Sequence, residues 1–240
     1  MDWTDRGIVL SARKHGESGV ILSLLTEAHG RHLGLVRGGA GRRARGLYEP
    51  GNLVEATWRA RLEDHLGSYS CELVTANAAA VLDDPPRLAG LSSLLAVVEA
   101  ALPEREAHPA IYRRAADLIE RLSAPDWLEA YVHFELALLR ELGFGLDLSA
   151  CAATGRNDQL VFVSPRTGRA VSASAGEPYR DKLLTLPLFL AGEGVPSASA
   201  AEILAGLRLT GYFLDCHIFV HGRSGEPPAR GRFLERLRVS

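Results

Sequence analysis

The chain has 240 residues, of which 47% are hydrophobic and 23% are charged, and its formal net charge is −2. A chain of this length and hydrophobicity buries a sizeable core as one or two domains, and it lacks the composition of a disordered protein. Its start has neither the basic nor the apolar segment of a secretory signal, and its longest apolar stretch, residues 183–191, is too short to cross a bilayer. The three cysteines are widely spaced, which indicates reduced thiols. We therefore expect a folded cytoplasmic protein without a membrane segment.

The charge is distributed unevenly along the chain. Residues 1–61 hold ten Lys/Arg and six Asp/Glu, residues 62–221 hold twelve and 21, and residues 222–240 hold five and two. This asymmetry indicates that the basic ends face an anionic partner. An unevenly charged solvated surface explains it equally well, so charge alone does not decide between the two.

The first 80 residues have the pattern of an all-β domain, because short runs of β-branched and leucine residues are separated by Gly, His and charged residues. We predict strands at residues 5–14, 19–26, 30–37, 52–61 and 67–77. Five short strands in so short a segment suit a small closed barrel, since closure removes free strand edges. We therefore predict a domain over residues 1–80 that is a five-stranded OB-type β-barrel.

The pattern changes to helical spacing after Ala80. Two aspartates and two prolines at residues 83–86 predict a helix start, because Asp accepts hydrogen bonds from free N-terminal amides and Pro fits the first turn. Apolar residues at helical spacing then predict helices at residues 88–102, 111–122, 125–142 and 200–221. These helices predict a bundle-like helical domain over residues 81–240, which makes the fold class α+β.

A segment of different composition interrupts the helices at residues 148–176. Its β-like runs at residues 160–163 and 169–172 flank a turn at residues 164–168, which predicts an inserted β-hairpin. The tail after Gly222 is rich in Gly, Pro and Arg, and we expect it to be mobile.

The strongest indication of a nucleic-acid ligand is the segment at residues 37–45, which holds four arginines, no acidic residue and several glycines. Arg side chains pair with phosphate oxygens whatever the base sequence, so binding should be sensitive to salt and neutral to sequence. In an OB fold, a connection between strands lies among the ligand-binding loops. The alternative is a solvated loop in a chain in which 25 of the 27 basic residues are Arg. The predicted DNA-binding residues are Arg13, Lys14, Arg31, Arg37, Arg42, Arg43, Arg45 and Tyr48.

Two aromatic residues are candidates for stacking on bases. Trp58 shares an alternating apolar face with Val54 and Ala56, so we expect it to point into the barrel core. Tyr48, just beyond the basic segment, is therefore the better stacking candidate.

The common catalytic signatures are missing from the sequence. Neither Lys14 nor Lys182 follows a Walker-type loop, and no metalloprotease, nucleophile-elbow or dinucleotide-binding pattern occurs. Cys216 and His217 are adjacent, but neighbours on a helix point about 100° apart, so we interpret Cys216 as a packed thiol. We therefore predict that the protein is not an enzyme and needs no cofactor.

Several short strings occur in a recognisable order. They are residues 5–10 (DRGIVL), 15–18 (HGES), 29–31 (HGR), 35–39 (LVRGG), 134–139 (FELALL), 142–145 (LGFG) and 148–151 (LSAC). In their order and spacing, from the first strand to the last helix, they resemble the RecO family of bacterial DNA repair proteins.

The resemblance implies an OB barrel, a helical domain and a zinc-finger-like insertion. It also implies a recombination mediator that binds single- and double-stranded DNA, anneals complementary strands and helps to load recombinase onto strands coated by single-strand-binding protein. In the family this work is done with RecR, and often with RecF, at the nucleoid.

Many members of the family carry two Cys-x-x-Cys pairs in the insertion, the spacing of a tetrahedral zinc site. Here Cys151 remains, Thr154 stands three residues on, and residues 171–175 (VSASA) contain no cysteine. One thiolate does not hold structural zinc, so we predict no metal. The hairpin is then held by packing of Leu160, Phe162 and Val171.

The resemblance also implies a receptor on the helical domain for the acidic C-terminal tail of single-strand-binding protein. Basic residues often precede the matching Phe134 string, whereas Val132 and His133 do so here. The predicted partner-binding residues are Arg113, Arg114, Arg121, His133, Phe134 and Arg140. A second class of function stays open, in which the protein is an interaction adaptor with little DNA binding of its own.

Overall fold

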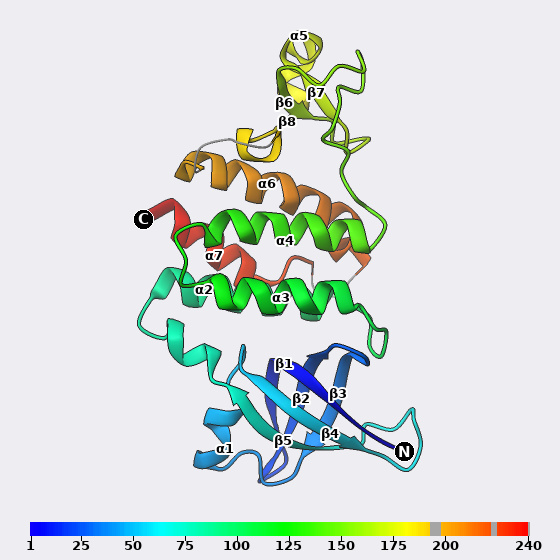
Figure 1. Cartoon of the computed structure of the whole chain (residues 1–240), viewed down its shortest axis with the longest axis vertical. Coiled ribbons are helices and arrows are strands. Elements are labelled where there is room, and N and C mark those ends of the chain that lie inside the picture. The colour runs from blue at the N-terminus through cyan, green and yellow to red at the C-terminus, as the bar shows by residue number, and fades with distance from the viewer. Residues whose placement is uncertain (193–197, 222–224, 240) are drawn as a thin grey trace. The chain divides into compact units, whose positions relative to one another are not determined.

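The computed structural model describes residues 1–192, 198–221 and 225–239, which form two compact units (Figure 1). Unit 1 comprises Met1–Ser123 and Pro227–Phe233, and unit 2 comprises Ala124–Glu226 and Leu234–Ser240. The side chains of Arg42, Arg43 and His221 lie outside the described part. No helix in the described ranges is long and apolar enough to span a bilayer.

Unit 1 contains a closed five-stranded barrel, as predicted. Its strands are β1 (Asp2–His15), β2 (Gly19–Thr26), β3 (Gly30–Val36), β4 (Leu53–Arg59) and β5 (Ser68–Thr75). They pair in the order β1-β2-β3-β5-β4, and β4 closes onto β1. All pairs are antiparallel except β3 with β5. This OB-like order confirms the barrel predicted from the alternation of apolar residues.

Alternate side chains of the strands fill the barrel. Val54, Ala56 and Trp58 of β4 are 0%, 0% and 2% exposed, and they belong to one buried cluster with residues of the other strands. Trp58 donates from Nε1 to the Leu66 carbonyl oxygen at 3.0 Å, which satisfies its polar atom. The prediction that Trp58 is a core residue is therefore confirmed.

The basic segment is not the free loop that its glycines suggested. Residues Arg42–Leu47 form the short helix α1. Gly41 precedes it in an extended conformation, and its carbonyl oxygen accepts from the amides of Ala44 and Arg45 at 3.0 and 3.1 Å. Ala44 and Leu47 pack against the barrel core, so burial of these two side chains favours a helix where composition indicated a loop.

Two helices complete unit 1 after a short 3-10 turn, η1 (Asn77–Val81). They are α2 (Pro85–Ala101) and α3 (Pro109–Arg121). Asp84 caps α2 by accepting from the Arg87 amide at 3.1 Å, and a proline occupies the first turn, as predicted from residues 83–86.

Unit 2 is built around α4 (Trp127–Glu141) and α6 (Ala200–His217), which pack together, and η4 (Phe219–His221) follows α6. Ser199 and Glu202 form a capping box at the start of α6. The expectation of a mobile tail after Gly222 was wrong for most of its length. Residues Pro228–Val239 form α7, which belongs to unit 1 as far as Phe233 and to unit 2 from Leu234. Phe233 is fully buried, so apolar burial orders a segment whose composition suggested mobility.

The insertion of unit 2 is a small antiparallel sheet. It contains β6 (Leu160–Val163), β7 (Ala170–Ser172) and β8 (Leu184–Thr185) in the order β7-β6-β8. Short helices connect them, namely α5 (Ala173–Gly176), η2 (Glu177–Lys182) and η3 (Leu188–Leu190). The predicted hairpin is confirmed, and Leu160 and Val171 are buried in agreement with the predicted packing, whereas Phe162 is only half-buried. Strand β8 was missed because two residues are too few to show a period.

Candidate nucleic-acid interface

One end of the barrel gathers most of the predicted DNA-binding residues. The register places the end of β1 beside the start of β2 and the end of β3, through the pairs Lys14–Val20 and Val20–Val36. The Ala40 amide donates to the Ser18 carbonyl oxygen at 3.0 Å, which fixes the start of the basic segment to the β1–β2 turn. Arg13, Lys14 and residues 37–45 therefore lie at this end of the barrel, which we call the basic end.

The cations of the basic end are available to an anionic ligand. Lys14, Arg37 and Arg45 are exposed. Arg13 is 3.4 Å from Glu99, but its side chain is 73% exposed, so this ion pair is weak in water. Several exposed positive side chains lie close together here, which is typical of a surface that binds phosphate groups.

Arg31 has a different role from the one predicted. Its Nε donates to the Leu102 carbonyl oxygen at 2.8 Å, and its guanidinium lies 3.4 Å from Glu104, with a side chain only 16% exposed. Arg31 thus holds the segment after α2 against β3, where Arg31 and Glu104 also form a backbone bridge. It is a structural residue in this conformation.

The same segment covers part of the outer face of β2 and β3. Ser23 and Leu25 of β2 are 1% and 0% exposed, and α3 packs against this strand. In OB folds the face of strands 2 and 3 commonly receives the nucleic acid. Here that face is partly occupied by the chain itself, so it is less open to a nucleic acid than the basic end.

Tyr48 is a core residue of the barrel. It is 8% exposed within the buried cluster, and burial raises the pKa of its hydroxyl to about 12. Its ring is therefore not available for stacking on a base, in contrast to the role predicted from its position after the basic segment.

The opposite end of the barrel holds a cavity that the sequence did not predict. It has a volume of about 360 Å³. Its lining residues are Met1, Asp2, Trp3, Ala28, His29, His32, Trp58, Glu63 and Arg105. They come from the start of β1, the β2–β3 turn, the start of β3 and the end of β4, with Glu63 from the β4–β5 connection and Arg105 from beyond α2. Such residues have no local pattern in common, and an inward-facing His in β3 was the only available signal.

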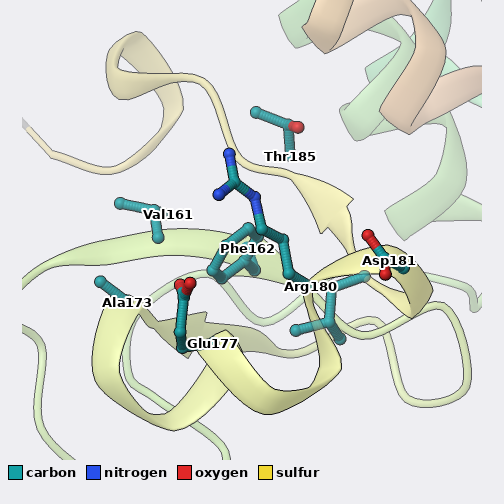
Figure 2. Close-up of a pocket in the computed structure, with 8 residues that line it drawn as sticks. Val161, Phe162, Ala173, Glu177, Arg180, Asp181 and Thr185 are labelled. Atoms are coloured by element: carbon teal, nitrogen blue, oxygen red, sulfur yellow. The ribbon is translucent and has the colours of Figure 1, made fainter.

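The insertion carries a hollow of about 550 Å³ on one face (Figure 2). Figure 2 shows Glu177 and Arg180 projecting from η2 near the ring of Phe162. Asp181 also lines the hollow, so its charged lining residues are two acids and one arginine. This charge balance does not suit an acidic peptide.

Cys151 lies in the interior of the insertion. Its sulfur is 3.4 Å from the Ser172 hydroxyl and 3.3 Å from the Ser172 amide nitrogen. The thiol is completely buried. Burial raises its pKa, but hydrogen bonds from Ser172 and Thr154 outweigh this and lower the pKa to about 6. Among the described residues, no group of three or more His, Cys, Asp or Glu is placed to hold a metal ion.

We expect Cys151 to be a thiolate at neutral pH. Because the pKa in the folded protein lies below the usual value of 9.0, its ionisation favours the folded state. This contribution is fully present above pH 9 and is lost as the pH falls towards 6. The thiolate ultraviolet absorbance, measured as a difference between the wild type and Cys151→Ser, should rise with a midpoint near pH 6. A midpoint near pH 9 would contradict the described hydrogen bonds.

The predicted partner-binding residues fall into two sets. Arg113, Arg114 and Arg121 are exposed on α3 of unit 1. In unit 2, His133 and Arg140 are exposed on α4, and the ring of His133 lies edge-on to Phe189 at 5.9 Å. Phe134 is 3% exposed, so it is a core residue of α4 and does not offer its ring to a partner in this conformation.

The Cys216–His217 pair does not form a catalytic site. Cys216 is exposed, so the interpretation of a packed thiol was wrong. The ring of His217 stacks on Phe144 at 4.6 Å with an interplanar angle of 6°. The imidazole is thus engaged with an aromatic ring.

Comparison with known proteins gives a consistent result for the whole chain. Residues 1–77 match the family model described as Recombination protein O N terminal, and residues 82–225 match Recombination protein O C terminal. "DNA repair protein RecO" of Rhodospirillum centenum is 55% identical over 240 residues, which cover 99% of this chain and 95% of the relative. The proteins of the same name from Methylorubrum populi and Phenylobacterium zucineum are each 52% identical and are covered to 97% and 98% of their lengths.

Proposed function

The chain belongs to the RecO family of DNA repair and recombination proteins, whose members are non-enzymatic mediators, and we propose that it binds single- and double-stranded DNA through the basic end of its barrel. The observation that carries this proposal is the cluster of exposed cations formed by Lys14, Arg37 and Arg45, with α1 beginning at Arg42. Side chains of this kind contact the phosphates of DNA, so binding does not depend on the base sequence.

Annealing follows from the same chemistry. A surface that neutralises phosphates on two strands lowers the repulsion between them, so complementary bases meet without any turnover step. We propose that the protein anneals complementary strands in this way and helps to load recombinase onto strands coated by single-strand-binding protein. Its proposed partners are RecR and the C-terminal tail of single-strand-binding protein, and its proposed location is the cytoplasm, at the nucleoid.

We also propose a functional division near residue 80. The barrel of residues 1–80 would bind DNA, and residues 81–240, with the insertion at about 148–176, would serve protein partners. The matches to the two family models support this division, since one ends at residue 77 and the other begins at residue 82. The exposed Arg113, Arg114, Arg121, His133 and Arg140 remain candidates for contacting the acidic tail.

Replacing Arg42, Arg43 and Arg45 together by Ala tests the proposal. We expect weaker binding to a single-stranded oligonucleotide and a smaller salt slope, which is the slope of the logarithm of the binding constant against the logarithm of the salt concentration. Its magnitude should fall by about 0.7 for each phosphate that the variant no longer neutralises. Fluorescence anisotropy at several salt concentrations measures both quantities.

A matched control removes the same charge elsewhere. Arg156, Arg166 and Arg180 are exposed in unit 2, and replacing them by Ala should leave the salt slope unchanged. If the first triple variant keeps the wild-type affinity and slope, or the wild type does not bind DNA in dilute buffer, the adaptor alternative is favoured.

A further inference from the structure

The cavity at the other end of the barrel, opposite the basic end, has walls of aromatic rings. Trp3 stacks on His29 with ring centroids 4.0 Å apart at 7°, and it lies 5.7 Å from Trp58 at 19°. His32 meets Trp58 edge-on at 4.9 Å. Rings locked against one another form a rigid surface suited to a flat heteroaromatic ligand.

His32 presents an unpartnered polar atom to this cavity. The residue is only 4% exposed, and its Nδ1 lies 2.9 Å from the Leu33 carbonyl oxygen and 3.2 Å from the Tyr69 hydroxyl oxygen. A carbonyl oxygen only accepts, so the shorter contact places the ring proton on Nδ1 and leaves Nε2 of the neutral ring as an acceptor. Nε2 has no hydrogen-bond partner within the described ranges, and it is not sealed from solvent. Burial, with Arg105 nearby, lowers the pKa of His32 to about 4, so the ring is neutral at pH 7.

The charges around the cavity are unsuited to a phosphate. Asp2 and Glu63 are among the residues that line it, and so is Met1, whose N-terminal ammonium donates to the Ala60 carbonyl oxygen at 2.8 Å. The guanidinium of Arg105 is engaged with backbone, because it donates to the carbonyl oxygens of Glu63, Asp64 and His65. Arg105 therefore fixes the β4–β5 connection as a wall of the cavity and offers little charge to an anion.

We propose that this cavity binds one unpaired nucleobase of single-stranded DNA, with a base N–H donated to Nε2 of His32 and the base ring against the aromatic walls. The volume lies within the usual range for small-ligand pockets, and every DNA base carries an N–H on its pairing edge. In a duplex these N–H groups are already used for pairing. The cavity thus favours single strands, and this inference rests on the proposed DNA binding.

Free deoxynucleosides test the cavity without any phosphate contact. The chain has three tryptophans, so the indole N–H region of a proton–nitrogen NMR spectrum contains few signals. At millimolar concentration we expect at least one of the four deoxynucleosides to shift the signals of Trp3 and Trp58 and to leave that of Trp127 unchanged. Deoxyribose 5-phosphate should shift none of them, and a derivative of the bound nucleoside with its pairing-edge N–H groups methylated should bind more weakly.

Two variants remove the site by different means. Ala28 is exposed in the β2–β3 turn and lines the cavity, so Ala28→Tyr should fill its mouth, and Ala80→Tyr on exposed η1 is the matched control. His32→Phe keeps a ring and removes the acceptor. In high salt, Ala28→Tyr should lower single-strand affinity by about 5- to 100-fold and leave duplex affinity unchanged, with His32→Phe acting in the same direction.

The outcomes separate this inference from the proposed function. Absence of any nucleoside shift in the wild type would overturn the cavity proposal even if oligonucleotides still bind through the basic end. Shifts that persist in Ala28→Tyr, or equal loss of single-strand and duplex binding, would also overturn it. Failure of the wild type to bind oligonucleotides at low salt would instead overturn the proposed function.

Discussion

We expect Gly30→Ala to lower the free energy of unfolding by about 3 kcal/mol or more. Gly30 begins β3 with a φ of +66°, a conformation that costs an L-residue about 1–2 kcal/mol. A Cβ atom there would lie 1.8 Å from the carbonyl oxygen of Glu106, which is backbone and cannot rotate away. The β2–β3 hairpin or the segment after α2 must therefore shift. Urea denaturation followed by circular dichroism measures the change in stability.

Gly16→Ala is the matched control for this prediction. Gly16 has a φ of +63°, and a Cβ there would meet no atom within 4 Å. This variant should show only the backbone cost, about 1 kcal/mol. Equal destabilisation in the two variants would mean that residues 104–106 do not lie against β3 as described. The outer face of β2 and β3 would then be open to DNA, and Arg31 would return as a candidate phosphate ligand.

The sequence predicted elements whose signal is local. Alternation in residues 54–58 placed Trp58 in the core, and the aspartates and prolines before α2 marked its start. Arg31 was misassigned because its partner, the Leu102 carbonyl oxygen, is 71 residues away, and no local pattern reports such a contact. Helix α1 was missed because its stability comes from packing of Ala44 and Leu47 on the barrel, whereas glycine and arginine dominate the local composition.

The candidate sites, like the fold, were predicted only where the signal is local in the sequence. Charge and glycine content were enough to find the basic segment, because phosphate binding needs exposed cations and little more. The cavity needed Trp3, His32 and Arg105 to meet from distant positions, so only the closed barrel revealed it. Tyr48 shows the opposite error, since its place beside the basic segment suggested exposure and the fold buries it.

The insertion places Ser172 and Thr154 beside the single thiol of Cys151, and Thr154 stands at the Cys-x-x-Cys spacing from it. Ser172 lies within 3.4 Å of the Cys151 sulfur, and Thr154 also donates a hydrogen bond to it. Sulfur atoms around tetrahedral zinc are about 3.8 Å apart, as follows from Zn–S bonds of about 2.3 Å. Ala175 stands three residues after Ser172 in α5, which completes the Cys-x-x-Cys spacing. Hydrogen bonds from Ser172 and Thr154 thus stabilise the Cys151 sulfur in the insertion for which the family resemblance implies zinc.

Replacing Thr154, Ser172 and Ala175 together by Cys should therefore create a site for one zinc ion per chain, while the wild type binds none. Structural zinc contributes about 10–16 kcal/mol in zinc-finger peptides, so we expect a rise in Tm on adding zinc that a chelator reverses. Elemental analysis gives the stoichiometry, and the cobalt spectrum reports tetrahedral thiolate ligation. The same triple variant with Cys151→Ala is the control, because it lacks one ligand and should bind zinc more weakly. Stoichiometric zinc in the wild type would contradict the predicted absence of metal, and an unmetallated triple variant would mean that Ala175 lies outside the tetrahedron.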